Sequence, residues 1–173
     1  ENGFGRIEVA NQPMMAFTLM WCGDTQRALN ATLEAVENAT RIGHGRAEML
    51  AHNAAFELYK AQAEFVPARK HANQALALAQ QLGAGRFEAM QETYIVELDF
   101  LQGERKTALK NVRVALAHCR DVGMSFVGPK VLGGFALVSD NEVERHAAIA
   151  EAEALLEAGS VSHNYPYFRI FAI

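Results

Sequence analysis

The sequence predicts an all-α protein, an α-solenoid of about four stacked antiparallel helix pairs plus a partial fifth. Three stretches of the 173-residue chain align at a spacing of forty residues, and each closes on a glycine, Gly43, Gly83 and Gly123. Apolar residues within these stretches recur at i, i+4, i+7 and i+8, which places them on one face of a helix. A period of this length is typical of helix pairs that bury their apolar faces against neighbouring pairs.

Small residues recur within the aligned stretches. They occupy two equivalent positions: Ala28, Ala68 and Ala108 at one, then Ala35, Ala75 and Ala115 at the other. Because small side chains let a neighbouring helix approach closely, we expect Ala75 and Ala115 to be buried between helices. Residues 1–173 are expected to form one helical-repeat domain. It would be a piece of a larger protein, since the chain starts at Glu1 and not at methionine.

Four helix pairs are predicted in chain order, with short turns between the helices. They cover 7–21 with 25–42, 46–64 with 66–82, 86–101 with 105–122, and 126–138 with 142–158. Gly23 ends the first helix, and Asp24 or Thr25 caps the second. In the fourth pair Gly159 follows Gly123 by only 36 residues, which indicates that one turn of helix is missing there.

The last fourteen residues have the register of another first helix, and no second helix follows them. Their apolar side chains crowd into the final nine positions: Tyr165, Tyr167, Phe168, Ile170, Phe171 and Ile173. A contiguous apolar patch of this kind marks an interaction surface. We expect this C-terminal tail to fold back onto the fourth repeat or to join two copies of the chain as a homodimer.

The turns between paired helices resemble those of tetratricopeptide repeats. Gly23 with Ala28, and Gly103 with Ala108, keep the Gly-x4-Ala spacing of that family. In the second unit Ala63 stands where the glycine is expected. The resemblance covers nearly the whole chain and implies stacked helix pairs.

The repeats also depart from the usual tetratricopeptide pattern. The period is longer, and only Tyr59 matches the aromatic signature of the first helix. Long, alanine-rich units, such as the run from Ala75 to Gly83, look like helical repeats near the C-terminus of large bacterial signalling proteins. These include LuxR-type ATPase regulators and class III nucleotide cyclases. The resemblance implies a regulatory module, with any ATPase or cyclase activity outside this chain.

Composition excludes several classes of partner. A formal charge of −4 and a pI near 5.9 provide no positive field for nucleic acid or an anionic membrane. The chain has no run of 18 apolar residues, so no transmembrane helix is predicted. The first residues do not have the pattern of a signal peptide. Cys22 and Cys119 do not have the spacing of a metal-binding or redox motif. We therefore expect both to be reduced thiols. We therefore expect a cytoplasmic protein that binds neither nucleic acid nor membrane.

No residue set predicts catalysis, a metal or a cofactor. The glycines of 128–134 resemble a phosphate loop, but Lys130 stands inside the loop and no Gly-Lys-Ser/Thr follows it. Close helix packing, with Pro129 in a first helical turn, is the interpretation that this pattern favours. The six histidines lack metal-site spacing. We predict that the chain is not an enzyme and does not hydrolyse ATP.

A basic stripe follows one face of 105–122. It consists of Lys106, Lys110, Arg113 and Arg120. The equivalent helix of the next unit carries acidic residues: Glu142, Glu144, Glu151, Glu153 and Glu157. The stripe could dock an anionic partner, but second helices of adjacent units are neighbours in such stacks. The pattern therefore favours partial ion pairing on a solvated face.

The first helices line the concave face in tetratricopeptide-like arrays. Carried over residue by residue, this register places eight side chains on or near a groove: Phe17, Trp21, Asn53, Glu57, Lys60, Thr93, Glu97 and Phe100. Polar and aromatic residues at helical spacing suit an extended peptide or a partner helix. The alternative is a solvent face without a ligand, in which the three aromatic residues serve packing.

Two functions from different classes follow from these patterns. The favoured one is a non-catalytic module for protein–protein interaction or regulation within a larger bacterial signalling or transcription regulator. Its partners would be protein or peptide segments, including other domains of the parent protein. The alternative is a small-molecule effector-sensing domain. A module needs an open groove, whereas a sensor needs a pocket that encloses most of its ligand.

Overall fold

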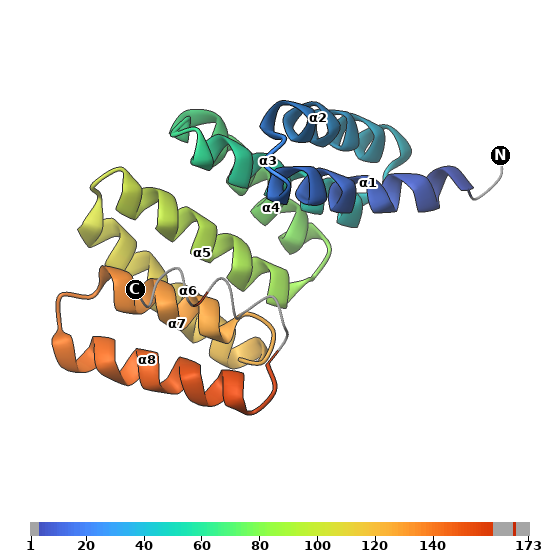
Figure 1. Cartoon of the computed structure of the whole chain (residues 1–173). Coiled ribbons are helices and arrows are strands. Elements are labelled where there is room, and N and C mark those ends of the chain that lie inside the picture. The colour runs from blue at the N-terminus through green and yellow to red at the C-terminus, as the bar shows by residue number, and fades with distance from the viewer. Residues whose placement is uncertain (1–3, 161–167, 169–173) are drawn as a thin grey trace. The chain divides into compact units, whose positions relative to one another are not determined.

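The computed structural model of the chain describes residues 4–160 and residue 168. These residues form consecutive antiparallel helix pairs (Figure 1). The bounds of the eight helices described are α1 Phe4–Trp21, α2 Thr25–Ile42, α3 Gly45–Ala61, α4 Phe65–Gln81, α5 Gly85–Leu101, α6 Arg105–Val122, α7 Gly128–Val138 and α8 Glu142–Glu157. The predicted all-α class of stacked helix pairs is confirmed. None of the described helices is long and apolar enough to cross a membrane.

The chain divides into two compact units, Glu1–Ala84 with α1 to α4 and Gly85–Ile173 with α5 to α8. Within the first unit each helix packs against the next, and the first helices α1 and α3 also contact each other. The second unit repeats this arrangement, with α5 against α7. Contact between successive first helices is what the stacking of helix pairs produces. A single domain over residues 1–173 stays a prediction.

Left-handed residues end most of these helices. The φ angle is 66° at Gly43 and 60° at Gly83, in a region that glycine enters without the steric cost of a Cβ atom. The left-handed conformation therefore explains why glycine occurs at the predicted end of each repeat. At the other end of α2, the Asp24 side chain accepts a hydrogen bond from the Arg27 N–H at 3.3 Å, which confirms Asp24 as the cap.

Helix α3 ends at Ala61, three residues before the predicted boundary. Ala63 adopts a left-handed conformation, with φ of 58°. Its N–H donates to the Lys60 carbonyl at 3.0 Å, and the Glu64 N–H donates to the Tyr59 carbonyl at 2.9 Å. These are the hydrogen bonds of a Schellman turn. Alanine therefore makes here the turn that glycine makes in the first and third units.

Replacing Ala63 with glycine is expected to raise the free energy of unfolding by about 0.5–1 kcal/mol. The left-handed conformation costs alanine roughly 1–2 kcal/mol, and the greater freedom of glycine in the unfolded chain offsets part of the gain. The matched control is Gly103→Ala, because Gly103 forms the same turn with φ of 82°. That variant is expected to lose about 1 kcal/mol. Urea denaturation measures both, and destabilisation by Ala63→Gly would contradict the turn assignment.

The missing turn of the fourth unit lies at the start of α7. This helix has 11 residues where α5 has 17, and it begins at Gly128, two residues later than predicted. Pro129 explains the shift, since proline has no N–H to bond a carbonyl from a preceding helical turn. A Cβ atom on Gly128 would lie 3.0 Å from the Met124 Cβ. The Gly/Pro segment thus serves close packing, as the sequence favoured.

Buried alanines form the seams between helices. Ala75 on α4 and Ala115 on α6 are fully buried, which confirms their predicted environment. On α6, Val112, Leu116 and Cys119 extend the same apolar stripe. The tail is described only at Phe168, whose side chain is buried. The predicted partial fifth repeat and tail contacts otherwise lie outside the described residues.

Ala115→Leu is expected to lower the free energy of unfolding by about 1–3 kcal/mol, because the added atoms overpack a seam without free space. The neighbouring Val114 provides a matched control, since its side chain points away from the seam and is exposed. Val114→Leu is expected to change stability by less than about 0.5 kcal/mol. Thermal melts that show equal midpoints for both variants would place Ala115 outside the seam.

Candidate partner-binding face

The eight side chains predicted for a groove lie in different environments. On α1, Phe17 is buried against Ala16 and Ala54, so it serves packing within the first unit. Trp21 is 75% exposed, with its ring centroid 6.0 Å from that of Phe17. On α5, Phe100 is partly buried. The aromatic members of the set therefore do not share one role.

The α3 members form a polar row. Asn53, Glu57 and Lys60 follow one another at spacings of three or four residues, on one face of the helix. The Lys60 Nζ lies 2.7 Å from a Glu57 carboxylate oxygen and 4.8 Å from the centroid of the Phe56 ring. The Asn53 side chain is buried, and its Oδ1 has no hydrogen-bond partner. The second carboxylate oxygen of Glu57, Oε1, is also buried without a hydrogen bond.

The α5 members lie forty residues later, at the equivalent positions. Thr93 is buried and donates its hydroxyl to the Ala89 carbonyl at 2.9 Å. Its methyl group faces α7, because a Cβ atom on Gly134 would lie 3.6 Å from it. Glu97 is buried too, and its carboxylate lies 3.1 Å from the Lys130 Nζ on α7. Glu57 and Glu97 thus hold equivalent positions, and each pairs with a lysine, Lys60 on the same helix and Lys130 on α7.

Lys130, which the sequence placed inside the glycine-rich segment 128–134, is a buried residue of α7. Its Nζ lies 3.8 Å from the centroid of the Tyr94 ring, on the same helix as Glu97. The lysine side chain is almost completely buried. Because the ammonium is held between the aromatic ring and the carboxylate, it is not exposed for a phosphate group to reach.

Sequence reasoning missed Gln91. This residue lies on α5 three positions before Tyr94 and six before Glu97, on the same face. Its side chain is 0% exposed, and neither Nε2 nor Oε1 has a hydrogen-bond partner. The helical spacing of these three residues was visible in the sequence. That its amide has no partner could not be read from the sequence, because this depends on the positions of the surrounding atoms.

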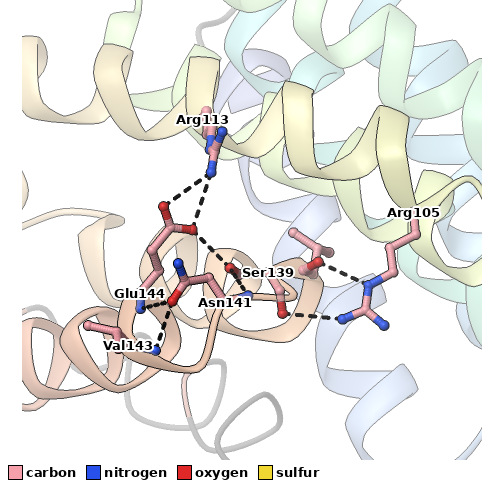
Figure 2. A network of polar contacts seen from close by, with 7 residues as sticks. Arg105, Arg113, Ser139, Asn141, Val143 and Glu144 are labelled. Carbon is pink, nitrogen blue, oxygen red and sulfur yellow. Dashed lines mark hydrogen bonds and ion pairs between the residues drawn. The ribbon is translucent and has the colours of Figure 1, made fainter.

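The basic stripe of α6 is partly neutralised by α8. Figure 2 shows the Arg113 guanidinium against the Glu144 carboxylate, at 3.2 Å. Farther along the two helices, Arg120 lies 3.0 Å from Glu151. These contacts confirm the predicted ion pairing on a solvated face. Lys106 and Lys110 are exposed.

The turn between α7 and α8 is held by side chains of the same region (Figure 2). Arg105 donates from Nε to the Val138 carbonyl at 3.1 Å and from its terminal nitrogen to the Ser139 carbonyl at 3.2 Å. The Asn141 side chain accepts from the backbone N–H groups of Val143 and Glu144, which makes it the cap of α8. Arg105, next to the basic stripe, and Asn141 therefore have a structural role in this turn.

A buried histidine pair in the first unit was also not predicted. The Nδ1 atoms of His52 on α3 and His71 on α4 lie 2.8 Å apart, and Tyr59 stacks on His71 at a centroid distance of 5.5 Å. Desolvation, followed by the positive charge of Lys70 on both rings and of His52 on His71, lowers the pKa of both imidazoles to about 4. Both rings are therefore neutral near pH 7, with one donating and the other accepting.

The thiols and acidic groups show no further centre of chemistry in the described residues. Cys22 is exposed and Cys119 is buried, and neither forms a disulfide. Burial raises the pKa of Cys119 to about 11, so it is a protonated, unreactive thiol. No three His, Cys, Asp or Glu side chains among residues 4–160 and 168 gather closely enough to hold a metal ion.

A scan against protein-family models and a search of curated proteins find no match to this chain. The description as a helical-repeat fold therefore rests on the helices themselves. Seven of the eight described helices have 16 to 18 residues, the helices follow in antiparallel pairs, and within each unit each helix packs on the next. The finer resemblance to tetratricopeptide repeats stays a proposal.

Proposed function

We propose that this chain is a non-catalytic, tetratricopeptide-like module that binds protein segments through the first helices of its pairs. The segments would come from partner proteins or from other domains of a larger bacterial regulator. One observation carries the proposal: polar residues recur at equivalent positions in the two units, the buried Asn53 and half-buried Glu57 on α3 and the buried Thr93 and Glu97 on α5. Apolar seams do not require polar residues at a fixed register, whereas a surface that grips an extended segment does.

Unused hydrogen-bonding capacity on the same helices supports this function. The Oδ1 atom of Asn53 and both polar side-chain atoms of Gln91 are buried without a partner. Most buried polar atoms in folded proteins are paired, and each unpaired one costs about 1–3 kcal/mol. A peptide group offers one N–H and one C=O, the complement of the Gln91 side-chain amide. Both side chains are almost completely buried, so a bound segment would satisfy these groups by drawing them outward to meet it.

The proposal predicts opposite changes in stability and binding for one substitution. Gln91→Leu is expected to raise the free energy of unfolding by about 1 kcal/mol, because it removes a buried amide that lacks hydrogen bonds. The same change should weaken binding of a selected peptide at least about tenfold, which corresponds to the loss of a hydrogen-bonded contact. Peptides would be selected from a random display library, and calorimetric titration would measure their affinity.

Gln80→Leu is the matched control, because Gln80 lies exposed on the second helix α4. Selected peptides should bind this variant as they bind the unchanged chain. Asn53→Leu tests the corresponding position on α3. Failure to enrich any peptide, or equal affinity for all three variants, would contradict the proposed function.

The alternative function, a small-molecule sensor, is favoured by one observation. Gln91 is fully buried with both polar side-chain atoms unpaired, and a small ligand is more easily enclosed at a buried position than an extended segment. A sensor predicts a thermal shift with one compound class from a metabolite library, lost in Gln91→Leu and kept in Asn53→Leu. A binding module predicts that no such compound is found and that both substitutions weaken peptide binding.

A further inference from the structure

Helix α7, the last first helix described, is buried almost all the way round. Ten of its eleven residues are buried. Within the second unit α7 packs against α5, α6 and α8 (Figure 1). Lys130 lies against Glu97 of α5, and the Phe135 ring centroid lies 6.0 Å from the Arg113 guanidinium of α6. These three helices account for three sides of α7, so the burial of its fourth side needs another neighbour.

Pro129, Gly133 and Ala136 lie on this fourth side, at spacings of four and three residues, and all three are buried. We call them the cap face. The same face of α5, forty residues earlier, packs on the next first helix, because the Thr93 methyl would lie 3.6 Å from a Cβ atom on Gly134 of α7. Its members are also buried: Ala89, Thr93 and Val96. By this repeat, the cap face is the side on which α7 would receive a following first helix.

The chain itself returns to this part of the fold after α8. The Ser160 hydroxyl donates to the Ser125 carbonyl at 2.8 Å, which holds position 160 beside the turn that precedes α7. Eight residues later, Phe168 belongs to the second unit, and only 4% of its surface is exposed. A large apolar side chain therefore lies against the second unit at a point beyond all of the described helix pairs.

The residues from position 168 onward have the chemistry that the cap face requires. Pro129, Gly133 and Ala136 provide neither a charge nor a polar side-chain atom. Residues 168–173 are apolar except for one arginine, with the sequence Phe-Arg-Ile-Phe-Ala-Ile. Gly133 has no side chain, which leaves room for a large one opposite, and close-packed interfaces alternate large and small residues in this way.

We propose that residues 168–173 dock on the cap face of α7, in the place of a fifth first helix, with Phe168 as the anchor. The occupant is thus the chain's own C-terminal segment. Seven residues separate Ser160 from Phe168, and a tether of this length gives an effective concentration on the order of millimolar. A segment of modest affinity therefore stays docked. The cap face is separate from the polar row of α3 and from Gln91, so this inference goes beyond the proposed function.

Thiol labelling of the full chain tests the docking. Ala136→Cys, in a Cys22→Ser background, places a thiol on the cap face, where Ala136 is almost completely buried. Its labelling should become at least about tenfold faster in Phe168→Asp, because a charged side chain opposes docking on an apolar face. The natural Cys119 is the internal control, since it is buried on α6 and should stay unlabelled in both proteins. Val143→Asp adds a charge at an exposed position of α8 and should leave the labelling rate unchanged.

A peptide added in trans provides the second measurement. A synthetic peptide of residues 161–173, at a concentration on the order of millimolar to match the tether, should restore slow labelling of Ala136→Cys in the Phe168→Asp chain. The same peptide carrying Phe168→Asp should not. Rescue by the first peptide alone would show that the cap face stays folded in the variant and binds this segment.

Three results would overturn the inference. Equal labelling of Ala136→Cys with and without Phe168→Asp would mean that other residues cover the cap face. Labelling of Cys119 together with Ala136→Cys, without rescue by the peptide, would make Phe168 a core residue of the second unit and not part of a docked segment. Protection that is lost on dilution, with a dimer in sedimentation velocity, would assign the docked segment to a second copy of the chain.

Discussion

Glu97→Leu is expected to lower the free energy of unfolding of the second unit by about 3–5 kcal/mol. The carboxylate lies 3.1 Å from the Lys130 Nζ, and both side chains are buried. The substitution removes a countercharge from an ammonium group that is held away from water. Because a desolvated charge is costly, this loss exceeds the attraction that the pair gained when it formed.

An exposed pair in the same unit is the control. Glu151→Leu removes the carboxylate that lies 3.0 Å from Arg120, and water surrounds both groups. This change is expected to cost less than about 1 kcal/mol. The double variant Glu97→Leu/Lys130→Met should recover most of the loss, since no buried charge is then left behind.

Urea denaturation followed by circular dichroism gives the free energies. Hydrogen exchange in α5 and α7 assigns them to this pair of helices. If Glu97→Leu costs no more than Glu151→Leu, the Lys130 ammonium does not depend on Glu97 as its countercharge, and the buried pair contributes little to stability.

Acidification is expected to destabilise the first unit as the pH falls from 6.5 to about 4, by at least about 3 kcal/mol for the coupled pair of imidazoles together. The pKa values of His52 and His71 fall from 6.5 to about 4 on folding. Above pH 6.5 both states hold neutral rings, and the full stability is present. As the pH falls below 6.5, His52 and His71 bind protons in the unfolded chain but stay neutral in the folded chain. The loss levels off below the folded pKa.

His52→Gln separates this effect from the titration of carboxylates. Glutamine still hydrogen-bonds to His71 but does not titrate, so the slope of stability against pH should become clearly shallower. His146→Gln is the control, because His146 is exposed on α8, and its slope should match that of the unchanged chain. Urea midpoints measured across this pH range decide the matter. Equal slopes in all three proteins would mean that the buried pair does not control acid stability.

Much of the fold could be predicted because its determinants are local. The forty-residue period located the helices, and the helix faces followed from apolar spacing. Three boundaries were wrong by two residues or more: α1 begins at Phe4 instead of residue 7, and two others differ for conformational reasons. Ala63 adopts the left-handed conformation that is usual for glycine, so α3 ends earlier than predicted. Pro129 moves the start of α7 to a later residue than predicted. The ion pairs of Arg113 and Arg120 were predicted because adjacent second helices are neighbours in any such stack.

The candidate partner-binding face was predicted less completely. The repeat register predicted that Asn53, Glu57, Thr93 and Glu97 lie on the first helices of their pairs. The structure confirms that they lie on α3 and α5. It could not show that Glu97 meets Lys130, since 33 residues separate them and Lys130 resembled a loop residue. It also gave no reason to select Gln91, because an unpaired amide is recognised only when every neighbouring atom is known.

The sequence by itself determined the repeat, the helix pairs, the glycines that close them and the apolar faces that stack. Each of these depends on the spacing of residues along one helix or between equivalent helices, and that spacing can be read directly from the sequence. Only the tertiary structure decided which polar groups meet: His52 with His71, Glu97 with Lys130, and Gln91 with no partner. Such contacts depend on where helix axes lie and how side chains rotate, to within an ångström or so, because hydrogen bonds and ion pairs weaken steeply with distance.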